Sequence, residues 1–356
     1  MKKLLIILGL VLFISSCGKN SKDDRDLPQL VAKSYSIGIA PSHIVDTPNS
    51  LFESDSNWRQ LSQNIDYYKY YGGQLMQGKE WNWINHIDSK SIVEFSKHHQ
   101  INIGCEFGDF HLEIENINDT YKLALQQLDP IFESGGKVSS IHLDGPFRRM
   151  IKGINNKPNA MNLKAICNTL SEFWINIHNK YPEIKIGLIV NLPNWDYTKE
   201  FVGYNGYYTD QSGYTYLQIL DTLNQRLNNL NKHIDFIEID CPYNYYKERY
   251  TRNKDSKLDN PSKFINIQKW CKKNHIDFNL IINAEHRQRG AMEFYNLTCK
   301  YVQKIRNAGI FPDTFTIQSW FTEPSNNLPE TEKYTFTNSA KDAIFLINEL
   351  YPKSNK

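Results

Sequence analysis

The stretch Ile237-Glu238-Ile239-Asp240 is a short apolar run that ends in an acidic residue, and it belongs to a series. Similar runs end at Glu106, Asp144, Asn191, Glu285 and Gln318-Ser319-Trp320. The segments between them are long enough for a helix and its loops, and this alternation indicates βαβ units on a parallel sheet. Strands that repeatedly end in a polar group are typical of a (β/α)8 barrel, whose active site lies at the C-terminal ends of its strands.

The spacing within each run predicts which side chains face the barrel lumen. Residues two apart on a strand face the same way, so the polar residues of one run share a face. The apolar residues between them then face the covering helices. The lumen-facing sets are His142 with Asp144, Glu238 with Asp240, Asn283 with Glu285, and Thr316 with Gln318 and Trp320.

The pattern predicts eight strands in one α/β domain, a (β/α)8 TIM barrel over residues 34–352. The first strand is expected at Tyr35–Ala40 and the second near Gly73–Met76, and the other six end at the residues quoted above. The segment Trp58–Tyr71 is expected to be helical because Leu61, Ile65 and Tyr68 have helical spacing. Further helices are expected over Ser91–His99, Thr120–Glu133, Asn162–Lys180, Gly213–Leu230, Pro261–Lys273, Ala291–Ala308 and Ser339–Leu350.

The first residues resemble the signal peptide of bacterial lipoproteins. Lys2 and Lys3 precede the apolar run Leu4–Ile14, which is too short to span a bilayer and ends in small residues before Cys17. The resemblance implies a signal peptide over residues 1–16 and a lipid anchor at Cys17 as the first mature residue. Residues 17–33 are polar and are expected to form a tether. Their Ser-Lys-Asp-Asp run resembles a signal for the outer face of the outer membrane. Ordinary signal cleavage is the alternative.

Composition indicates the class of partner. A net charge of +2 argues against nucleic acid, which requires a concentrated basic face. The chain has 21 Tyr and 7 Trp, and many follow the expected strand ends, where flat amphipathic rings can stack on sugars. The partner is therefore expected to be a carbohydrate. The five cysteines after Cys17 are widely spaced and odd in number, so they are interpreted as scattered core residues rather than disulfides or a zinc site.

Several other chemistries lack their motifs. No glycine-rich phosphate loop follows a strand, no HExxH or His-x-His pair indicates a catalytic metal, and Ser319 is not in a nucleophile elbow. The pair His98-His99 is interpreted as a helix end. Neither a cofactor nor a metal is expected, which leaves carboxylates, amides and aromatic rings.

Glycosidic bonds are cleaved by one carboxylic acid that protonates the leaving oxygen and a second carboxylate that attacks or activates water. With Glu106, Asp144, Asp240 and Glu285 at strand ends, the chain resembles TIM-barrel glycoside hydrolases in architecture and strand-end chemistry. In one large clan of these enzymes, Asn-Glu ends strand four and Glu ends strand seven, and only Glu285 matches. In α-glycosidases, aspartates end strands four and six, which matches Asp144 and Asp240.

The resemblance implies Asp144 as nucleophile or base, and Asp240 or Glu285 as general acid. Glu238, one layer deeper, is expected to orient His142 or a neighbouring strand rather than to perform chemistry. Arg148, Arg149 and Arg287 follow strand ends and are candidates for acidic sugars or for ordinary surface positions. The expected substrate-binding residues are Glu106, His142, Asn191, Trp195, Tyr243, Asn283, Gln318 and Trp320.

Two alternatives remain open. The first is a surface lipoprotein that binds glycans without cleaving them, since a fold does not imply a function. The second is a hydrolase or lyase of another bond, which would need only one of the carboxylates. The presence of several acids on separate strands favours the glycoside hydrolase.

Overall fold

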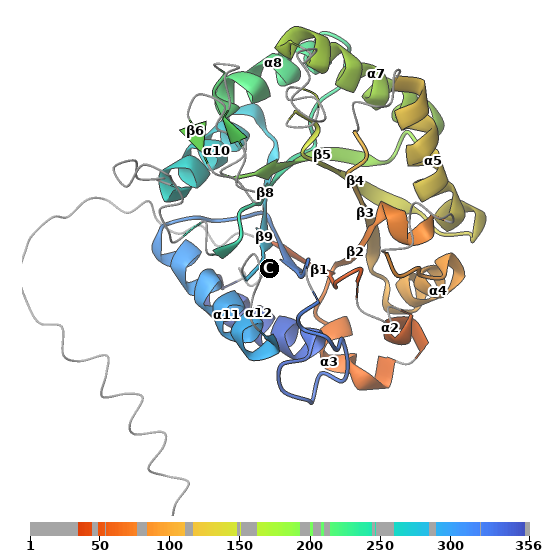
Figure 1. Ribbon diagram of the computed structural model, residues 1–356, viewed down its shortest axis with the longest axis vertical. Coiled ribbons are helices and arrows are strands. Elements are labelled where there is room, and N and C mark those ends of the chain that lie inside the picture. The colour runs from red at the N-terminus through yellow and green to blue at the C-terminus, as the bar shows by residue number, and fades with distance from the viewer. Residues whose placement is uncertain are drawn as a thin grey trace, which may run out of the picture. The chain divides into compact units, whose positions relative to one another are not determined.

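The computed structural model describes residues 35–44, 49–53, 55–76, 84–110, 117–147, 150, 162–192, 200–201, 208–209, 214–243, 246, 260–284, 290–320 and 322–352. Eight parallel strands within these ranges close into a TIM barrel (Figure 1). They are β1 (Ser36–Ala40), β2 (Tyr67–Tyr71), β3 (Asn102–Phe107), β4 (Val138–Asp144), β5 (Lys185–Asn191), β8 (Phe236–Asp240), β9 (Asp277–Ile282) and β10 (Thr314–Gln318). Their order around the barrel is β1-β10-β9-β8-β5-β4-β3-β2. A separate antiparallel pair joins β6 (Glu200–Phe201) and β7 (Tyr208–Thr209).

Helices surround the barrel (Figure 1). The buried residues of most of the longer ones are largely apolar. The longer ones agree with the predicted ranges to within a few residues, and none in the described ranges is long and apolar enough to cross a membrane. They are α4 (Ser89–His99), α5 (Ile117–Glu133), α7 (Leu163–Lys180), α8 (Tyr216–Asn228), α10 (Asn260–Asn274), α11 (Ala291–Asn307) and α12 (Phe336–Leu350). Shorter helical turns are α2 (Ser50–Glu53), η1 (Asp55–Asn57), α3 (Arg59–Ser62) and η2 (Gly72–Leu75).

The predictions for the second strand and the helix before it were wrong. The strand is Tyr67–Tyr71, the expected strand near Gly73–Met76 is mostly the 3-10 turn η2, and only α3 is helical in Trp58–Tyr71. All five residues of β2 are buried, and four of them are tyrosine. With aromatic rings on both faces, the strand lacks the apolar and polar alternation that marks a period of two. Tyr68 belongs to the core outside the barrel, whereas Lys69 is held by glutamates inside it.

Glycines make room for aromatic rings at the N-terminal end of the lumen. A Cβ atom on Gly38 of β1 would collide with the ring of Tyr67, and one on Gly187 of β5 would collide with the ring of Phe236. Barrel interiors are filled by layers of side chains contributed by alternate strands. Here two strands supply large rings, and their neighbours supply no side chain at that level.

Three aspartates fasten the N-terminal edge of the barrel. Each stands immediately before a strand and pairs with one residue of the adjacent strand. Its carboxyl group accepts a hydrogen bond from the backbone N–H of that partner residue at 2.7 to 2.9 Å. Its own backbone N–H donates to the carbonyl of the same partner. Carboxylate bonds to backbone amides are charge-assisted and are stronger than neutral ones. This edge is therefore fixed by repeated two-way contacts, which pair Asp66 with Ile37, Asp235 with Ile186, and Asp313 with Phe278.

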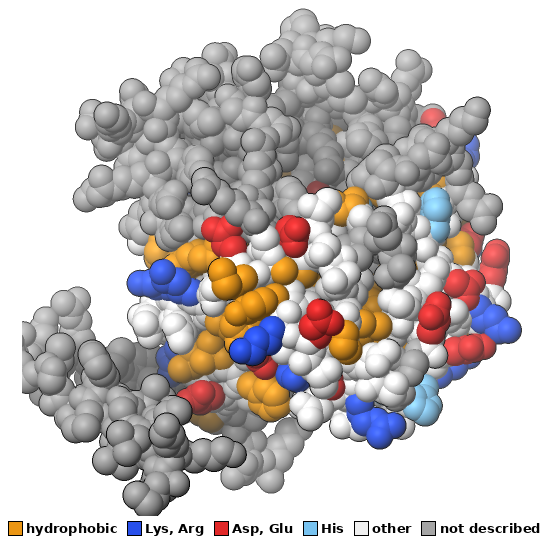
Figure 2. Space-filling model, turned by 60° about the horizontal axis from the view of Figure 1, so that its bottom comes forward, with side chains coloured by type: hydrophobic (Ala, Val, Ile, Leu, Met, Phe, Trp, Pro, Cys, Tyr) orange, Lys and Arg blue, Asp and Glu red, His pale blue; other side chains and the backbone are white. Residues whose placement is uncertain are grey.

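The described surface carries mixed charge. On the face shown in Figure 2, basic and acidic side chains are interspersed around a group of hydrophobic ones. The described cysteines are all free thiols, and four of the five are buried, as expected for scattered core residues.

We expect Gly187→Ala to lower the free energy of unfolding by about 1 to 3 kcal/mol, because the added methyl group forces the packed Phe236 ring to move. The matched control is Gly290→Ala, whose Cβ has nothing within 4 Å and which should stay within about 0.5 kcal/mol of the wild type. Equilibrium unfolding in urea measures both. Equal stability of the two variants would show that the ring layer is not tightly packed.

Candidate active site

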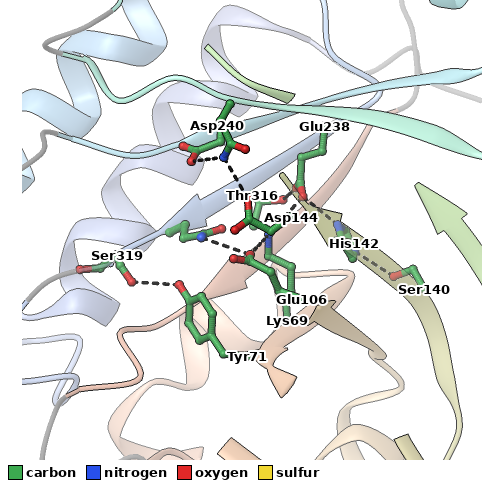
Figure 3. Close-up of polar contacts among 12 residues, drawn as sticks. Lys69, Tyr71, Glu106, Ser140, His142, Asp144, Glu238, Asp240, Thr316 and Ser319 are labelled. Carbon is green, nitrogen blue, oxygen red and sulfur yellow. Dashed lines mark hydrogen bonds and ion pairs between the residues drawn. The ribbon is translucent and has the colours of Figure 1, made fainter. Parts of the chain in front are cut away.

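Three acids and two amides from five strands meet at the C-terminal end of the lumen (Figure 3). Glu106, Asp144 and Asp240 are 4%, 9% and 5% exposed, so each is almost fully withdrawn from water. Asn191 donates hydrogen bonds to Asp144 and Asp240, and Gln318 donates one to Glu106. The strands position this group because every second residue of a strand points into the lumen, and in each of the five strands the polar residue near the C-terminal end is one of these, as the sequence predicted.

Asn191 joins Asp144 to Asp240. Its Nδ2 donates to Asp144 Oδ1 at 3.0 Å and to Asp240 Oδ2 at 3.2 Å. The amide assignment follows from these bonds, since only NH2 can donate to two carboxyl groups. Burial, together with the charge of Asp144, raises the pKa of Asp240 to about 7. Asp240 is therefore a carboxylic acid that holds or releases a proton near neutral pH.

Glu106 is held by a buried lysine. Its Oε2 lies 2.8 Å from Lys69 Nζ and 3.3 Å from Gln318 Nε2. Burial raises the pKa of Glu106 to about 8, because the opposing attraction of Lys69 does not outweigh the loss of solvation and the nearby Asp144 adds to the rise. Glu106 is therefore mainly protonated at neutral pH.

Glu238 occupies the layer below and anchors Lys69 from the other side. Lys69 Nζ lies 3.1 Å from Glu238 Oε2, the same oxygen lies 2.7 Å from His142 Nδ1, and Thr316 Oγ1 donates to Glu238 Oε1 at 2.7 Å. Burial alone would raise the pKa of Glu238, but the charge of Lys69 and the hydrogen bonds from His142 and Thr316 hold it below its ordinary value. Burial lowers the pKa of His142, so the ring is neutral at pH 7. As predicted, Glu238 orients His142.

Aromatic rings form one wall near the acids. Tyr71 at the end of β2 packs against His43 and Trp320, with ring centroids 4.3 and 4.8 Å away, and these two rings also contact each other at 5.2 Å. The Tyr71 hydroxyl donates to the Ser319 carbonyl at 3.1 Å. Burial lowers the pKa of His43 to about 4, so this ring is also neutral. Trp320 is partly exposed, which suits a surface for a stacked sugar.

Five buried oxygens around these acids accept no hydrogen bond from the described residues. Each belongs to a residue at or just after a strand end, and four of the five residues also engage a neighbour through another side-chain atom. Buried acceptors without donors cost free energy, so such a group calls for a donor that comes from water or from a ligand. The oxygens are Glu106 Oε1, Asn191 Oδ1, Asp240 Oδ1, Asn283 Oδ1 and Gln318 Oε1.

The structure does not bring every predicted residue to this site. Tyr243 is buried against Tyr301 under α11, with ring centroids 5.6 Å apart, and is not among the residues around the acids. His142 lies one layer below them and contacts Glu238. Sequence reasoning missed Lys69, Tyr71 and His43. The predictions for Cys17, Arg148, Arg149, Trp195, Glu285 and Arg287 lie outside the described residues.

A separate cavity of about 630 Å³ opens at the opposite, N-terminal mouth of the barrel. It is lined by residues at strand starts, including Tyr67, Ser140 and Asn279, and reaches His142. None of Glu106, Asp144 and Asp240 lines it. Among the described residues, no group of three or more His, Cys, Asp or Glu is placed to hold a metal ion.

Comparison with known proteins locates similar barrels but no family. No protein-family model matches the chain, and no curated protein matches it. Similar solved structures include GH5_18 from Streptomyces cattleya in complex with GlcNAc, at 7% identity and a TM-score of 0.49, covering 91% of this chain and 82% of that one. The catalytic domain of beta-amylase from Paenibacillus polymyxa is 9% identical, with a TM-score of 0.48 and coverage of 81% and 92%.

A sugar phosphate isomerase/epimerase from Parabacteroides distasonis is also similar, at 12% identity and a TM-score of 0.43, with coverage of 89% and 95%. All three are less than 25% identical to this chain. These likenesses therefore do not identify a reaction for this chain, and the geometry of its own site has to carry that argument.

We expect Asp240→Asn to become increasingly stabilising, relative to the wild type, as pH rises from 4 to 7. In this window the unfolded Asp240 ionises while the folded one keeps its proton, so the wild type loses up to about 1.4 kcal/mol of stability per pH unit from this group. Asp240→Asn does not lose stability in this way, because residue 240 no longer titrates. Urea unfolding at pH 5 and pH 8 measures the difference in the free energy of unfolding between the variant and the wild type, with the exposed Asp119→Asn as control. The same stability difference at both pH values would contradict the buried, protonated Asp240.

Proposed function

We propose that this protein is an exported glycoside hydrolase that uses Asp144 and Asp240 as its catalytic carboxylates. One observation carries the proposal: the two side chains share the amide of Asn191, and the pKa of Asp240 is raised to about 7 by burial and by the charge of Asp144. Paired carboxylates whose environments separate their proton affinities are the arrangement that glycosidic cleavage requires.

In this mechanism Asp240 donates a proton to the leaving glycosidic oxygen. Asp240 Oδ2 is engaged by Asn191, and Oδ1 has no partner among the described residues, so the proton resides on Oδ1 and is available to a ligand. Asp144, on the other side of the amide, attacks the anomeric carbon or activates water. Asn191 keeps both groups in place while the proton moves.

The main alternative is a protein that binds glycans on this site without cleaving them. The aromatic wall of Tyr71 and Trp320 supports either role. A binding site alone has no need for a carboxylic acid that titrates near neutral pH, and this property of Asp240 favours the enzyme.

We expect Asp144→Asn to abolish release of reducing ends while leaving the fold intact. The change preserves size and removes the charge that attack on the anomeric carbon requires, so a loss of several powers of ten in rate should follow. Purified mature protein and the variant are screened against a panel of polysaccharides. The exposed Glu94→Gln serves as control and should keep wild-type turnover. Normal turnover by Asp144→Asn would remove Asp144 from the mechanism, and glycan binding without any wild-type cleavage would favour the alternative.

Export and membrane anchoring are part of the proposal and rest on the N-terminal sequence alone. The segment over residues 1–16 supports secretion, and Cys17 at its end supports lipid attachment. Anchoring at the outer membrane would place the enzyme where polymeric glycans are encountered.

We expect Cys17→Ala to block lipid attachment. Without the thiol that receives the lipid, the protein should remain unprocessed or leave the membrane fraction, and mass spectrometry of the wild type should find an acylated N-terminal cysteine. The nearby substitution Ser21→Ala is the control and should change neither. Membrane fractionation and maturation of Cys17→Ala like those of the wild type would rule out a lipid anchor at this residue.

A further inference from the structure

We propose that Glu106 contacts the substrate directly, donating a hydrogen bond from Oε1, and that Lys69 is the positioning residue that fixes this carboxyl group. The proposal rests on the site proposed above and adds to it a specific sugar contact, to an oxygen that accepts hydrogen bonds. Neither residue is used as the nucleophile or the general acid in that mechanism.

The two oxygens of Glu106 are in different states. Oε2 accepts from Lys69 Nζ at 2.8 Å and from Gln318 Nε2 at 3.3 Å, which occupies both of its lone pairs. Oε1 is buried and has no partner among the described residues. A proton on Glu106 therefore resides on Oε1, the oxygen that remains free to bind a ligand.

Charge balance explains why Glu106 keeps this proton. Lys69 is fully buried between Glu106 and Glu238 and is the cation for both carboxyl groups. Glu238 also has hydrogen bonds with His142 and Thr316, so its ionised form is favoured. The carboxyl group of Glu106 has fewer contacts that favour ionisation, and burial raises its pKa to about 8. One lysine thus holds one ionised and one protonated carboxyl group.

Lys69 also determines where Glu106 lies. Its Nζ is held from below by Glu238, which is itself bonded on both oxygens, so the ammonium group has a fixed position (Figure 3). Glu106 binds that group through one oxygen, which directs the other away from it. The titratable groups that face Glu106 are Tyr67, Lys69 and Tyr71 of β2, Asp144 of β4 and Glu238 of β8.

The contact selects for ligand chemistry. A protonated Glu106 donates, so it suits a hydroxyl, ring or glycosidic oxygen of a sugar. The neighbouring oxygens Asn191 Oδ1 and Gln318 Oε1 accept, so they suit hydroxyl groups that donate. A neutral sugar offers both kinds of group at adjacent positions. A carboxylate or phosphate at this level would meet the charges of Asp144 and Glu238.

The first test reads the proton on Glu106 without any ligand. Infrared difference spectra between the wild type and Glu106→Gln should show a protonated carboxyl band at pH 6.5 that disappears as pH rises through about 8. In Lys69→Met the band should persist to a pH at least one unit higher, because the attraction that favours ionisation is lost. If Lys69 had only a structural role, Lys69→Met would change the stability of the protein and leave the pH at which the Glu106 band titrates unchanged.

If Lys69→Met does not fold, Lys69→Met/Glu238→Gln removes the unpaired charge. Its titration is then compared with that of Glu238→Gln alone, so that the two proteins differ only in Lys69. The absence of a protonated band from Glu106, or a band that titrates at the same pH without Lys69, would overturn the assignment. The exposed Glu94→Gln is the control for the difference measurement.

The second test measures sugar binding, in an Asp144→Asn background that prevents turnover. The probes are D-glucose, D-galactose, D-mannose, D-xylose and N-acetyl-D-glucosamine, followed by isothermal titration calorimetry. Binding of the probe by the background should weaken as pH rises and Glu106 loses its proton. Glu106→Gln retains an N–H donor, so it should bind the best probe within about threefold of the background at pH 6.5 and should weaken less as pH rises. Glu106→Ala should bind at least about tenfold more weakly, as expected for one lost hydrogen bond.

Binding by Glu106→Ala equal to that of the background would overturn the proposal, as would failure of every probe to bind. Because neither test requires turnover, the result is separable from the proposed function. Sugar binding that depends on Glu106 in a protein that cleaves no glycan would refute the hydrolase and leave this inference standing.

Discussion

The ammonium group of Lys69, buried without solvent between two glutamates, is the interaction on which the rest of the site depends. A buried charge is tolerated only when it is paired and hydrogen-bonded, and here one cation serves two carboxyl groups. The lower carboxylate, Glu238, gains additional donors and ionises. The upper one, Glu106, is left protonated near the substrate end of the lumen. This division gives the upper layer its proton donors.

The contacts at the two ends of the barrel differ in kind. At the N-terminal edge, three aspartates bond backbone groups of adjacent strands, and glycines admit aromatic rings into the lumen. These contacts fix the positions of the strands relative to one another. At the C-terminal end, oxygens of Glu106, Asp240 and Gln318 remain without partners among the described residues. These three oxygens lie at the end of the barrel where TIM-barrel enzymes have their active sites.

Much of this arrangement could be predicted from the sequence, because six strands have one apolar and one polar face. Their period of two placed Glu106, Asp144, Asn191, Asp240 and Gln318 correctly around one end of the lumen. The second strand escaped prediction because tyrosines on both faces conceal the same period. Lys69 was missed with it, since its role depends on glutamates that are distant in sequence. For Tyr243 the sequence gives no direction, because a tyrosine after a strand can pack under a helix as readily as inward, and its ring packs against Tyr301 of α11.

The central claim is that Asp144 and Asp240 flank the bond that is cleaved, and a crystal structure of Asp144→Asn with a bound oligosaccharide tests it most directly. The account predicts a glycosidic oxygen within hydrogen-bond distance of Asp240 Oδ1, the anomeric carbon facing residue 144, and a sugar ring against Trp320. An oligosaccharide seated instead in the cavity at the N-terminal mouth, or bound at the acids with no glycosidic oxygen near Asp240, would contradict it.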